Sequence, residues 1–453
     1  MHSIDHPALP LLSSYSKNGV PVVITSEPWS LEKKDAAMAR GNHKSASEYT
    51  TFLREEMTTM RRKGMFIVVP YDLLRHIPGL CLSPIGCIPQ RDRRPRMIND
   101  YTFSELNQHT HKLAPAESMQ WGRTLDRVLS RIYYADRRHG PVLLSKTDLA
   151  DGFYRIPLTP TGALKLAVPF PNLPSEPQLV AIPTVLPMGW TESPPAFSSV
   201  TETITDVINE SLEREADTIA PAHDLEPAAS TSVPLLPSIP DPSPIIEAGP
   251  IRPRLAYVDC FVDDFIKLCQ GWLNGIRVRR ATYHIIDSIL RPNDSSDTYR
   301  EFPISLRKLL KGDDFWSTQK VILGWFIDTV SLTISLPQHR QDKLLQILTD
   351  VISKSRVSLK EWQKLLGELR SMSLAIPGSK GCFSFLQEAL TPTSSSVNIT
   401  CVVRDQLKDF LWLAKDIINR PTHLAEVVPS PLLTLVQWMR LKLVWVASGS
   451  PLI

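Results

Sequence analysis

The sequence lacks the features that mark secreted, zinc-stabilised and membrane-spanning proteins. Its 453 residues include only six cysteines, and no two of them form a Cys-x-x-Cys pair. No histidine lies at zinc-finger spacing, so we expect scattered thiols in a reducing compartment. The N-terminus has no basic segment followed by an apolar core, which argues against a secretory signal. We therefore expect an intracellular protein, either cytoplasmic or nuclear.

Long apolar runs and a strong net charge are also missing. No stretch of about 18 apolar residues occurs, so we expect no membrane span and no membrane partner. The net charge is only +3, which does not by itself indicate a nucleic-acid-binding protein. The charge is uneven, however, because Lys and Arg outnumber Asp and Glu between residues 50 and 150. A basic block of this kind is typical of a surface that binds a polyanion.

Composition divides the chain into ordered and disordered stretches. Residues 1–50 are polar and irregular, and we expect a poorly ordered N-terminal lead-in. Residues 121–138 have the pattern of a basic amphipathic helix. Residues 213–253 are acidic and rich in proline, and because this composition cannot bury a core we expect a disordered insertion.

The C-terminal part of the chain shows regular patterns again. Two alternating apolar runs within residues 321–337 flank Asp-Thr-Val-Ser and predict a β-hairpin. Two helices are expected within residues 340–378, and another at about 402–418. Asp328-Thr329 is similar to the start of an aspartic-protease motif, but Val330 replaces the glycine and favours the hairpin.

Two adjacent aspartates, Asp263 and Asp264, interrupt the apolar stretch AYVDCFVDDFIKL. A hairpin turn alone would explain them, since Asp is common in turns. The apolar flanks, however, predict buried strands, and two carboxylates at such a tip repel each other unless a divalent cation neutralises them. Oxygen ligands at a partly hydrated site favour Mg²⁺. Asp259 lies four strand residues earlier, roughly 13 Å away, and is assigned a structural role.

A magnesium site for phosphoryl transfer needs a further carboxylate from another part of the chain. Asp148 is the best candidate because it ends the apolar strand predicted at 141–149. Asp151 is the competing candidate, but a helix-capping or turn role explains it more simply.

Five motifs now occur in an order that resembles a known family. They are RPRMINDYTFSELN, KTDLADGFYRI, LPMGWTESPPAFSS, FVDDF and LGWFIDTVSLTISLP. Together they resemble the reverse transcriptases of retroelements, especially retrotransposons, over residues 80–390. The resemblance implies an α+β right-hand polymerase with fingers, palm and thumb, in which a ferredoxin-like palm sheet bears the catalytic aspartates.

The resemblance also implies domain limits. Residues 51–340 would form the fingers and palm, interrupted by the insertion at 213–253. Residues 341–392 would form a helical thumb, and residues 393–435 a connection toward a missing ribonuclease H domain.

Catalytic and metal-binding roles follow from the resemblance for Asp148, Asp263 and Asp264. In the family these carboxylates bind two Mg²⁺ ions, for which Mn²⁺ is an expected substitute. One ion activates the primer 3′-hydroxyl, and the other binds the triphosphate and stabilises the leaving pyrophosphate. A lysine acting as general acid is expected downstream, and Lys308, Lys311 and Lys320 all qualify.

Nucleotide-binding roles are implied for four residues. Arg96 matches the fingers arginine that contacts the triphosphate. For Arg91, Arg93 and Arg94, contact with a template phosphate and a solvated charge are the alternatives. Phe153 stands at the steric-gate position, where a ring would crowd a 2′-hydroxyl; the alternative is a core aromatic. Met188 stands where many relatives have Gln, and its thioether cannot hydrogen-bond the sugar as an amide does. Gly189 permits close backbone approach to the nucleotide.

Primer-grip roles are implied for Leu323, Gly324 and Trp325, in the motif LGWFIDTVSL. The expected partners are a primer–template of RNA or DNA and deoxynucleoside triphosphates. The function implied is an RNA-directed DNA polymerase. The alternatives are a truncated, catalytically inactive remnant that at most binds nucleic acid, and a DNA-templated or cellular polymerase.

The last residues, 436–453, show no clear period and carry no acidic residue. A shift of reading frame can turn Gln437–Ser450 into a segment that resembles the first strand of a ribonuclease H fold. We therefore interpret residues 436–453 as the tail of a frameshifted or truncated copy. Sequencing the gene beyond Leu435 tests this, and a second frame without a ribonuclease H continuation would rule it out.

Overall fold

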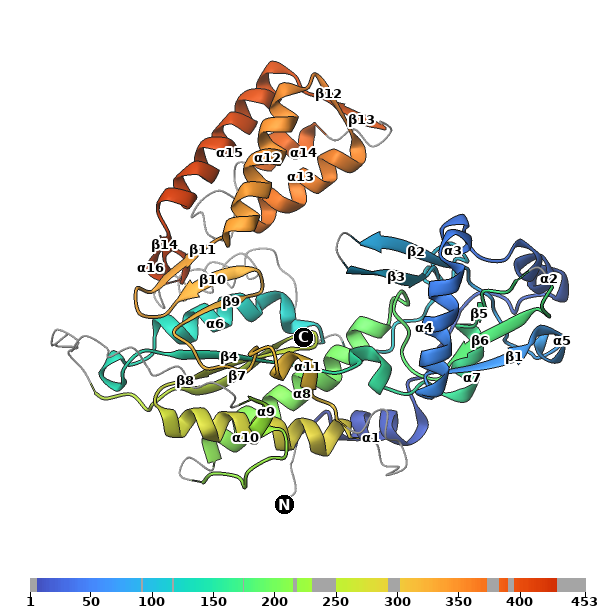
Figure 1. The fold of residues 1–453 in the computed structure, drawn as a ribbon, viewed down its shortest axis with the longest axis horizontal. Coiled ribbons are helices and arrows are strands. Elements are labelled where there is room, and N and C mark those ends of the chain that lie inside the picture. The colour runs from blue at the N-terminus through green and yellow to red at the C-terminus, as the bar shows by residue number, and fades with distance from the viewer. Residues whose placement is uncertain are drawn as a thin grey trace, which may run out of the picture.

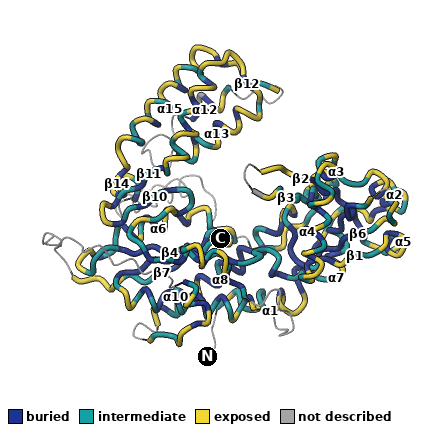
Figure 2. Tube along the Cα trace, viewed as in Figure 1, coloured by how far each residue is buried: buried dark blue, intermediate teal, exposed yellow. Residues whose placement is uncertain are grey.

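The computed structural model describes residues 6–90, 93–115, 118–173, 175–214, 218–229, 250–291, 302–372, 383–389 and 395–429. These residues form three parts: an N-terminal lobe, a central layer and a C-terminal bundle. Figure 1 shows the lobe and the bundle rising from opposite ends of the central layer. The buried residues follow the inside of each part, whereas exposed residues line the outer helices (Figure 2).

The central layer is a three-stranded antiparallel sheet in the order β4-β8-β7, covered by helices. Helices α8 and α10 pack against its strands, and α6 contacts β7. The elements of this layer are α1 (Leu9–Asn18), η1 (Gln120–Arg123), α6 (Thr124–Tyr133), η2 (Arg137–His139), β4 (Leu143–Asp148), η3 (Gly152–Arg155), α8 (Ser193–Arg214), α9 (Glu226–Ala229), β7 (Ala256–Phe261), β8 (Asp264–Cys269), α10 (Trp272–Leu290) and α11 (Leu306–Leu309).

The sheet is apolar on both faces, and each face belongs to a different core. Leu143 and Phe265 point into the core shared with α8 and α10. Their neighbours Leu144 and Ile266 point into the core shared with α6 and the C-terminal bundle. Side chains alternate between faces along a strand, so both strands are covered on both sides. This explains why the residues directly beside Asp263-Asp264 are apolar on both sides.

The N-terminal lobe combines helices with a three-stranded sheet, β1-β6-β5, and a separate hairpin of β2 and β3. Its elements are α2 (Leu31–Arg40), α3 (Lys44–Glu48), α4 (Thr50–Arg62), β1 (Phe66–Pro70), α5 (Tyr71–Leu74), β2 (Ile85–Gln90), β3 (Arg93–Asn99), α7 (Pro160–Lys165), β5 (Val168–Pro169) and β6 (Leu179–Pro183).

The lead-in expected at residues 1–50 differs from the structure. Residues 9–18, 31–40 and 44–48 form α1, α2 and α3, and Tyr15, Met38 and Ala46 are buried in the core shared with α8 and α10. These helices are short and mostly polar, so their order depends on packing against distant segments. A local pattern of apolar residues does not reveal such order.

The C-terminal bundle stands on a four-stranded sheet, β14-β11-β10-β9. Strands β10 and β11 pair antiparallel around residues 329–332, which confirms the predicted hairpin. The elements are β9 (Gln319–Ile322), β10 (Trp325–Asp328), β11 (Thr333–Ser335), α12 (Gln338–Ser353), β12 (Arg356–Ser358), α13 (Leu359–Met372), α14 (Phe383–Glu388), β13 (Ser396–Asn398), α15 (Cys401–Asn419), β14 (Thr422–His423) and α16 (Leu424–Val427).

Two expected boundaries also differ from the structure. Helix α15 packs along α12, so the bundle runs to Asn419 and does not end at residue 392. Within the insertion expected at 213–253, residues 218–229 are ordered: Leu225 is buried, and Glu226 pairs with Arg280 of α10. Most of the remaining insertion, and the tail at 436–453, lie outside the described residues. Among the described residues, no helix is long and apolar enough to cross a membrane.

A buried cluster of charges fixes the central sheet to α10. Asp314 is fully buried and pairs with Lys267 of β8 and Arg279 of α10. Thr147 of β4 donates its hydroxyl to Asp314 Oδ1 at 2.6 Å. Burial acts to raise the pKa of Asp314, but the charges of Lys267 and Arg279 outweigh it and lower that pKa. One carboxylate therefore ties two strands and a helix together beside the end of β4 that carries Asp148.

We expect Asp314→Ala to lower the free energy of unfolding by about 3–5 kcal/mol, because it leaves two buried cations without their counter-charge. Urea denaturation followed by circular dichroism measures the change. Asp409→Ala, on the exposed face of α15, is the control and is expected to change stability by less than about 0.5 kcal/mol. Equal stability of the two variants would contradict the expectation.

Candidate active site

The β7–β8 hairpin carries Asp263 and Asp264 at one end of the central sheet. Phe261 pairs with Asp264, so Val262 and Asp263 form a two-residue turn. Val262 has a φ of 59°, a left-handed conformation that is strained for a β-branched residue. Such strain persists only where the surrounding structure enforces it, and it clusters at functional sites.

Asp148 and Asp264 lie opposite each other in the register of β4 and β8. The hydrogen-bonding interaction between their carboxyl groups acts on both pKa values, lowering that of Asp148 and raising that of Asp264. Burial, followed by the hydrogen bond and charge of Asp148, raises the pKa of Asp264 to about 7. Burial acts in the same direction on Asp148, but the hydrogen bond from Asp264 and the charge of Lys308 outweigh it and lower its pKa.

Asp263 is the third carboxylate of this end of the sheet. Burial and the charge of Asp148 raise its pKa above the usual range. Its side chain borders a cavity next to the hairpin rather than joining the Asp148–Asp264 hydrogen bond. Within the described residues, no three His, Cys, Asp or Glu side chains gather closely enough to count as a preformed metal-binding group.

Two lysines face the aspartate pair. Lys308 Nζ lies 3.3 Å from Asp148 Oδ2, and Lys146 Nζ lies 3.7 Å from Asp264 Oδ1. Of the three lysines expected as general acid, Lys308 is therefore the one in contact with these carboxylates. Lys320 instead donates to the carbonyl of Phe315, and burial lowers its pKa to about 8. Lys311 is exposed.

The donor set at the pair fits a divalent cation. Asp264 Oδ1 is buried and accepts no hydrogen bond from the described residues. An unsatisfied buried carboxylate oxygen is costly, and so is the close approach of two carboxylates. A cation bound by Asp148 and Asp264 would offset both costs, and carboxylate oxygens are the hard ligands that Mg²⁺ prefers.

A cavity of about 260 Å³ adjoins Asp263. Phe153 forms part of its wall and meets Phe197 of α8 edge to face, with ring centroids 4.6 Å apart. Phe153 is half-buried, so its ring both packs on α8 and presents a surface to the cavity. The other lining residues are Leu149, Asp151, Gly152, Tyr154, Met188 and Val262.

The turn at Met188-Gly189 forms another part of the site. Gly189 has a φ of 104°, and a Cβ there would lie 2.2 Å from the carbonyl oxygen of Asn99. Only glycine therefore fits. Asn99 donates to the carbonyl of Met188 at 3.1 Å, and Asn107 donates to that of Gly189 at 3.0 Å. Neither asparagine was among the residues expected from the sequence, although both lie within the motif RPRMINDYTFSELN.

The expected triphosphate arginine, Arg96, lies at the same turn. Its guanidinium is exposed and approaches Met188 Sδ at 3.5 Å. Arg94 instead pairs with Glu56 of α4 at 3.0 Å. Arg91 lies outside the described residues, and the side chain of Arg93 is not described.

The residues expected to grip a primer form the turn between β9 and β10. Leu323 and Gly324 have φ values of 50° and 81°, and Ile322 pairs directly with Trp325. Arg340 of α12 donates to the carbonyl of Gly324 at 3.0 Å. Trp325 is buried, with 1% exposed, so it supports the turn from within the core.

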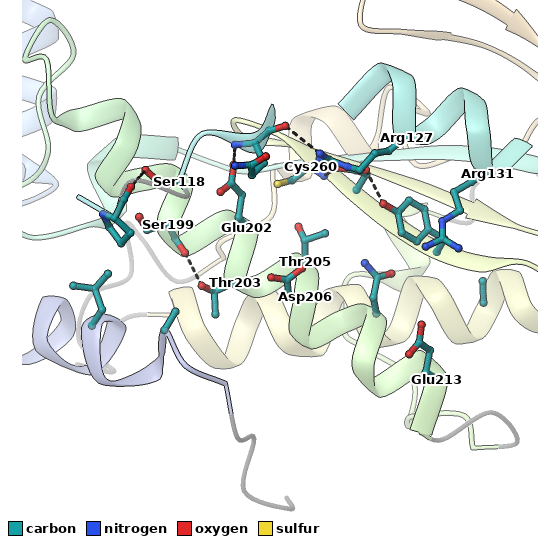
Figure 3. A pocket seen from close by; sticks show the side chains of 18 of the residues that line it. Ser118, Arg127, Arg131, Ser199, Glu202, Thr203, Thr205, Asp206, Glu213 and Cys260 are labelled. Atoms are coloured by element: carbon teal, nitrogen blue, oxygen red, sulfur yellow. Dashed lines mark hydrogen bonds and ion pairs between the residues drawn. The ribbon is translucent and has the colours of Figure 1, made fainter. Parts of the chain in front are cut away.

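Asp259 has the structural surroundings that its position predicted. Both of its carboxylate oxygens accept hydrogen bonds from Arg127 of α6, at 2.7 and 2.8 Å, and Tyr257 donates to it at 2.8 Å. The pair borders a second cavity of about 640 Å³ between α1, α6, α8 and β7. Figure 3 shows Arg127 and Arg131 on one side of this cavity and Glu202 and Asp206 on the other.

Comparison with known proteins identifies the fold. No family model matches the sequence, and no curated protein matches it. The chain is similar to a structure of the foamy viral protease–reverse transcriptase dRH in complex with double-stranded DNA. The TM-score is 0.52, with 14% sequence identity over 90% of this chain and 52% of that chain. This chain thus spans about half the length of that structure.

A second structure is the foamy viral protease–reverse transcriptase in complex with double-stranded DNA. It gives a TM-score of 0.48 and 15% identity over 84% of this chain and 59% of that chain. At 14% identity, the first of the two comparisons shows the fold alone. The protein has a mixed helix-and-sheet fold similar to reverse transcriptase structures, as its motifs predicted.

We expect Asp264→Asn to stabilise the metal-free protein above neutral pH. Asp264 has a pKa of about 7 in the folded protein, above the usual value of about 3.9. The folded wild type therefore loses stability as pH rises from about 4 through 7, whereas the asparagine does not titrate. The advantage of the variant should therefore grow from pH 5 to pH 8.

Urea denaturation in the presence of a chelator measures this difference at each pH. Asp126→Asn, which alters an exposed carboxylate on α6, is the control and should follow the wild type throughout. A difference between Asp264→Asn and wild type that does not change with pH would contradict the assigned protonation.

Proposed function

We propose that the protein is an RNA-directed DNA polymerase that transfers nucleotides from deoxynucleoside triphosphates to a primer 3′-hydroxyl. The observation that carries the proposal is the meeting of Asp148 and Asp264 in one register, with Asp263 turned to the adjoining cavity. The fold, similar to reverse transcriptase structures, supports it. A retrotransposon-type element is the source that the motifs favour.

Asp148, Asp263 and Asp264 would hold two Mg²⁺ ions in this proposal, and Mn²⁺ would substitute. Bound there, the ions would neutralise the charge of the triphosphate and of the developing pyrophosphate. The chain's own contribution is to hold the carboxylates in place through the β4–β8 ladder, which is covered on both faces. Because Lys308 touches Asp148, its ammonium group stands ready to donate a proton to the leaving pyrophosphate.

Nucleotide binding is assigned to the cavity next to Asp263. Arg96 would bind the triphosphate, since its exposed guanidinium can form paired hydrogen bonds to phosphate oxygens. Phe153 would exclude a 2′-hydroxyl, because its ring is held on Phe197 and cannot turn away freely. Met188 and Gly189 would support the base pair from the other side of the cavity.

A primer–template would lie between the N-terminal lobe and the C-terminal bundle, which then act as fingers and thumb. The similar foamy viral structure is itself a complex with double-stranded DNA. The basic excess in residues 50–150 suits binding to the phosphate backbone. The turn of Leu323 and Gly324, fastened by Arg340, would contact the primer end.

Primer extension tests the proposal. The wild type should extend a DNA primer on an RNA template with Mg²⁺ or Mn²⁺, and Asp263→Asn should lower the rate by at least about 10²–10³-fold, because charge stabilisation in the transition state is lost. Asp126→Asn is the control and should extend normally, since this carboxylate is exposed on α6.

The same assay separates the alternatives. Extension on DNA templates alone would indicate a DNA-templated polymerase. Failure of the wild type on both templates with either metal would favour a catalytically inactive remnant that at most binds nucleic acid.

A further inference from the structure

An ion pair connects the N-terminal lobe to the wall of the nucleotide cavity. Lys63 Nζ lies 3.1 Å from Asp151 Oδ1 and 3.2 Å from Oδ2, so it contacts both carboxylate oxygens. Lys63 is the residue at the C-terminal end of α4, whereas Asp151 lies in the central layer, just before η3. Neither residue touches the Asp148–Asp264 pair.

Asp151 does not have the usual role of an aspartate in this position. It precedes η3, where an aspartate side chain normally accepts a hydrogen bond from a backbone N–H of the first turn. Here the side chain makes no such cap and turns to Lys63. Asp151 does lie in the turn that the sequence predicted. Its carboxylate, however, pairs with Lys63, a residue 88 positions earlier in the chain.

The backbone at Asp151 determines where Phe153 stands. Asp151 and Gly152 have φ values of 65° and 45°, two successive left-handed residues directly before the ring. A Cβ at Gly152 would lie 4.0 Å from Asp263 Oδ2, so this backbone passes close to the carboxylates. A left-handed conformation is uncommon for a residue other than glycine, and a contact from outside the segment helps to maintain it.

Charge gives a second reason for the pair. Asp151 and Asp263 both line the cavity, and a bound triphosphate would add further negative charge. Asp148, Asp263 and Asp264 are the carboxylates assigned to metal ions, and Asp151 is not among them. Its repulsion of a triphosphate must be balanced by a side chain, and Lys63 supplies the positive charge.

We propose that Lys63 is a positioning residue for nucleotide selection. Its ion pair with Asp151 fixes the backbone that carries Phe153 and neutralises a carboxylate in the cavity wall. The inference rests on the proposed function of that cavity. Lys63 acts through Asp151 and is not itself a catalytic residue.

Single-nucleotide incorporation by the full chain tests this inference. Lys63→Met should raise the KM for the deoxynucleotide about tenfold, because Asp151 is left as an unbalanced negative charge in the cavity wall, with little change in kcat. Its preference for deoxynucleotides over ribonucleotides should fall as the gate becomes less well placed. Lys63→Arg keeps the charge and should restore both values. Arg62→Met, at the neighbouring exposed cation, should match the wild type.

A double-mutant cycle with Asp151→Asn isolates the pair. Once the carboxylate is neutral, adding Lys63→Met should change KM much less than it does in the wild type. Thermal unfolding of each variant shows whether a loss reflects folding instead. The inference fails if Lys63→Met leaves KM and sugar preference unchanged, or if the two substitutions act independently.

A separate measurement distinguishes failure of this inference from failure of the proposed function. If the wild type incorporates no nucleotide, the proposed polymerase activity is ruled out. Binding of dTTP with Mg²⁺ is then measured by tryptophan fluorescence. Binding that is about tenfold weaker in Lys63→Met and restored in Lys63→Arg would still support the role of Lys63. Equal binding by all variants, or none by the wild type, would overturn it.

Discussion

The pairing of β4 with β8 is the constraint on which the site depends. It places Asp148 directly opposite Asp264, where burial and the neighbouring carboxyl group raise the pKa of Asp264. A slip of β8 by one residue would move Asp264 to the other face of the sheet and separate it from Asp148. The register is secure because Leu144 and Phe265 belong to cores on opposite faces of the sheet. The burial of two apolar cores thus offsets the free-energy cost of placing Asp148 next to Asp264.

The buried charges next to Asp148 and Asp264 also help to fix the pairing of β4 with β8. Asp314 binds Thr147 and Lys267, which lie near the site on β4 and β8, and joins them to α10 through Arg279. A site must be held by a rigid surrounding shell if its geometry is to be reproducible. Satisfied buried polar groups supply such a shell with directional contacts that apolar packing cannot give.

Local patterns in the sequence predicted those elements whose residues carry their own signal. The β7–β8 hairpin, the helix α6 and the β10–β11 hairpin all show a clear apolar period or a turn motif. Helices α1–α3 and the ordered segment 218–229 do not, because their order comes from partners far along the chain, such as the Glu226–Arg280 pair. The expected end of the C-terminal bundle at residue 392 differs from the structure for the same reason, because α15 packs on α12 and so belongs to the bundle.

The sequence by itself determined the residues of the candidate site: Asp148, Asp263, Asp264, the Phe153 ring and the glycine of the Met188 turn. Adjacent carboxylates between apolar strands cost too much free energy to be explained by packing. Phe153 and Gly189 were identified because they lie in the motifs that accompany these carboxylates. The tertiary structure decided which side chains meet. It brought Lys308, one of the three candidate lysines, to Asp148, and it joined Lys63 to Asp151. It also placed the side-chain amides of Asn99 and Asn107 against the carbonyl groups of the turn at Met188 and Gly189. Contacts between residues far apart in the chain depend on the packing of whole elements, and no local pattern records them.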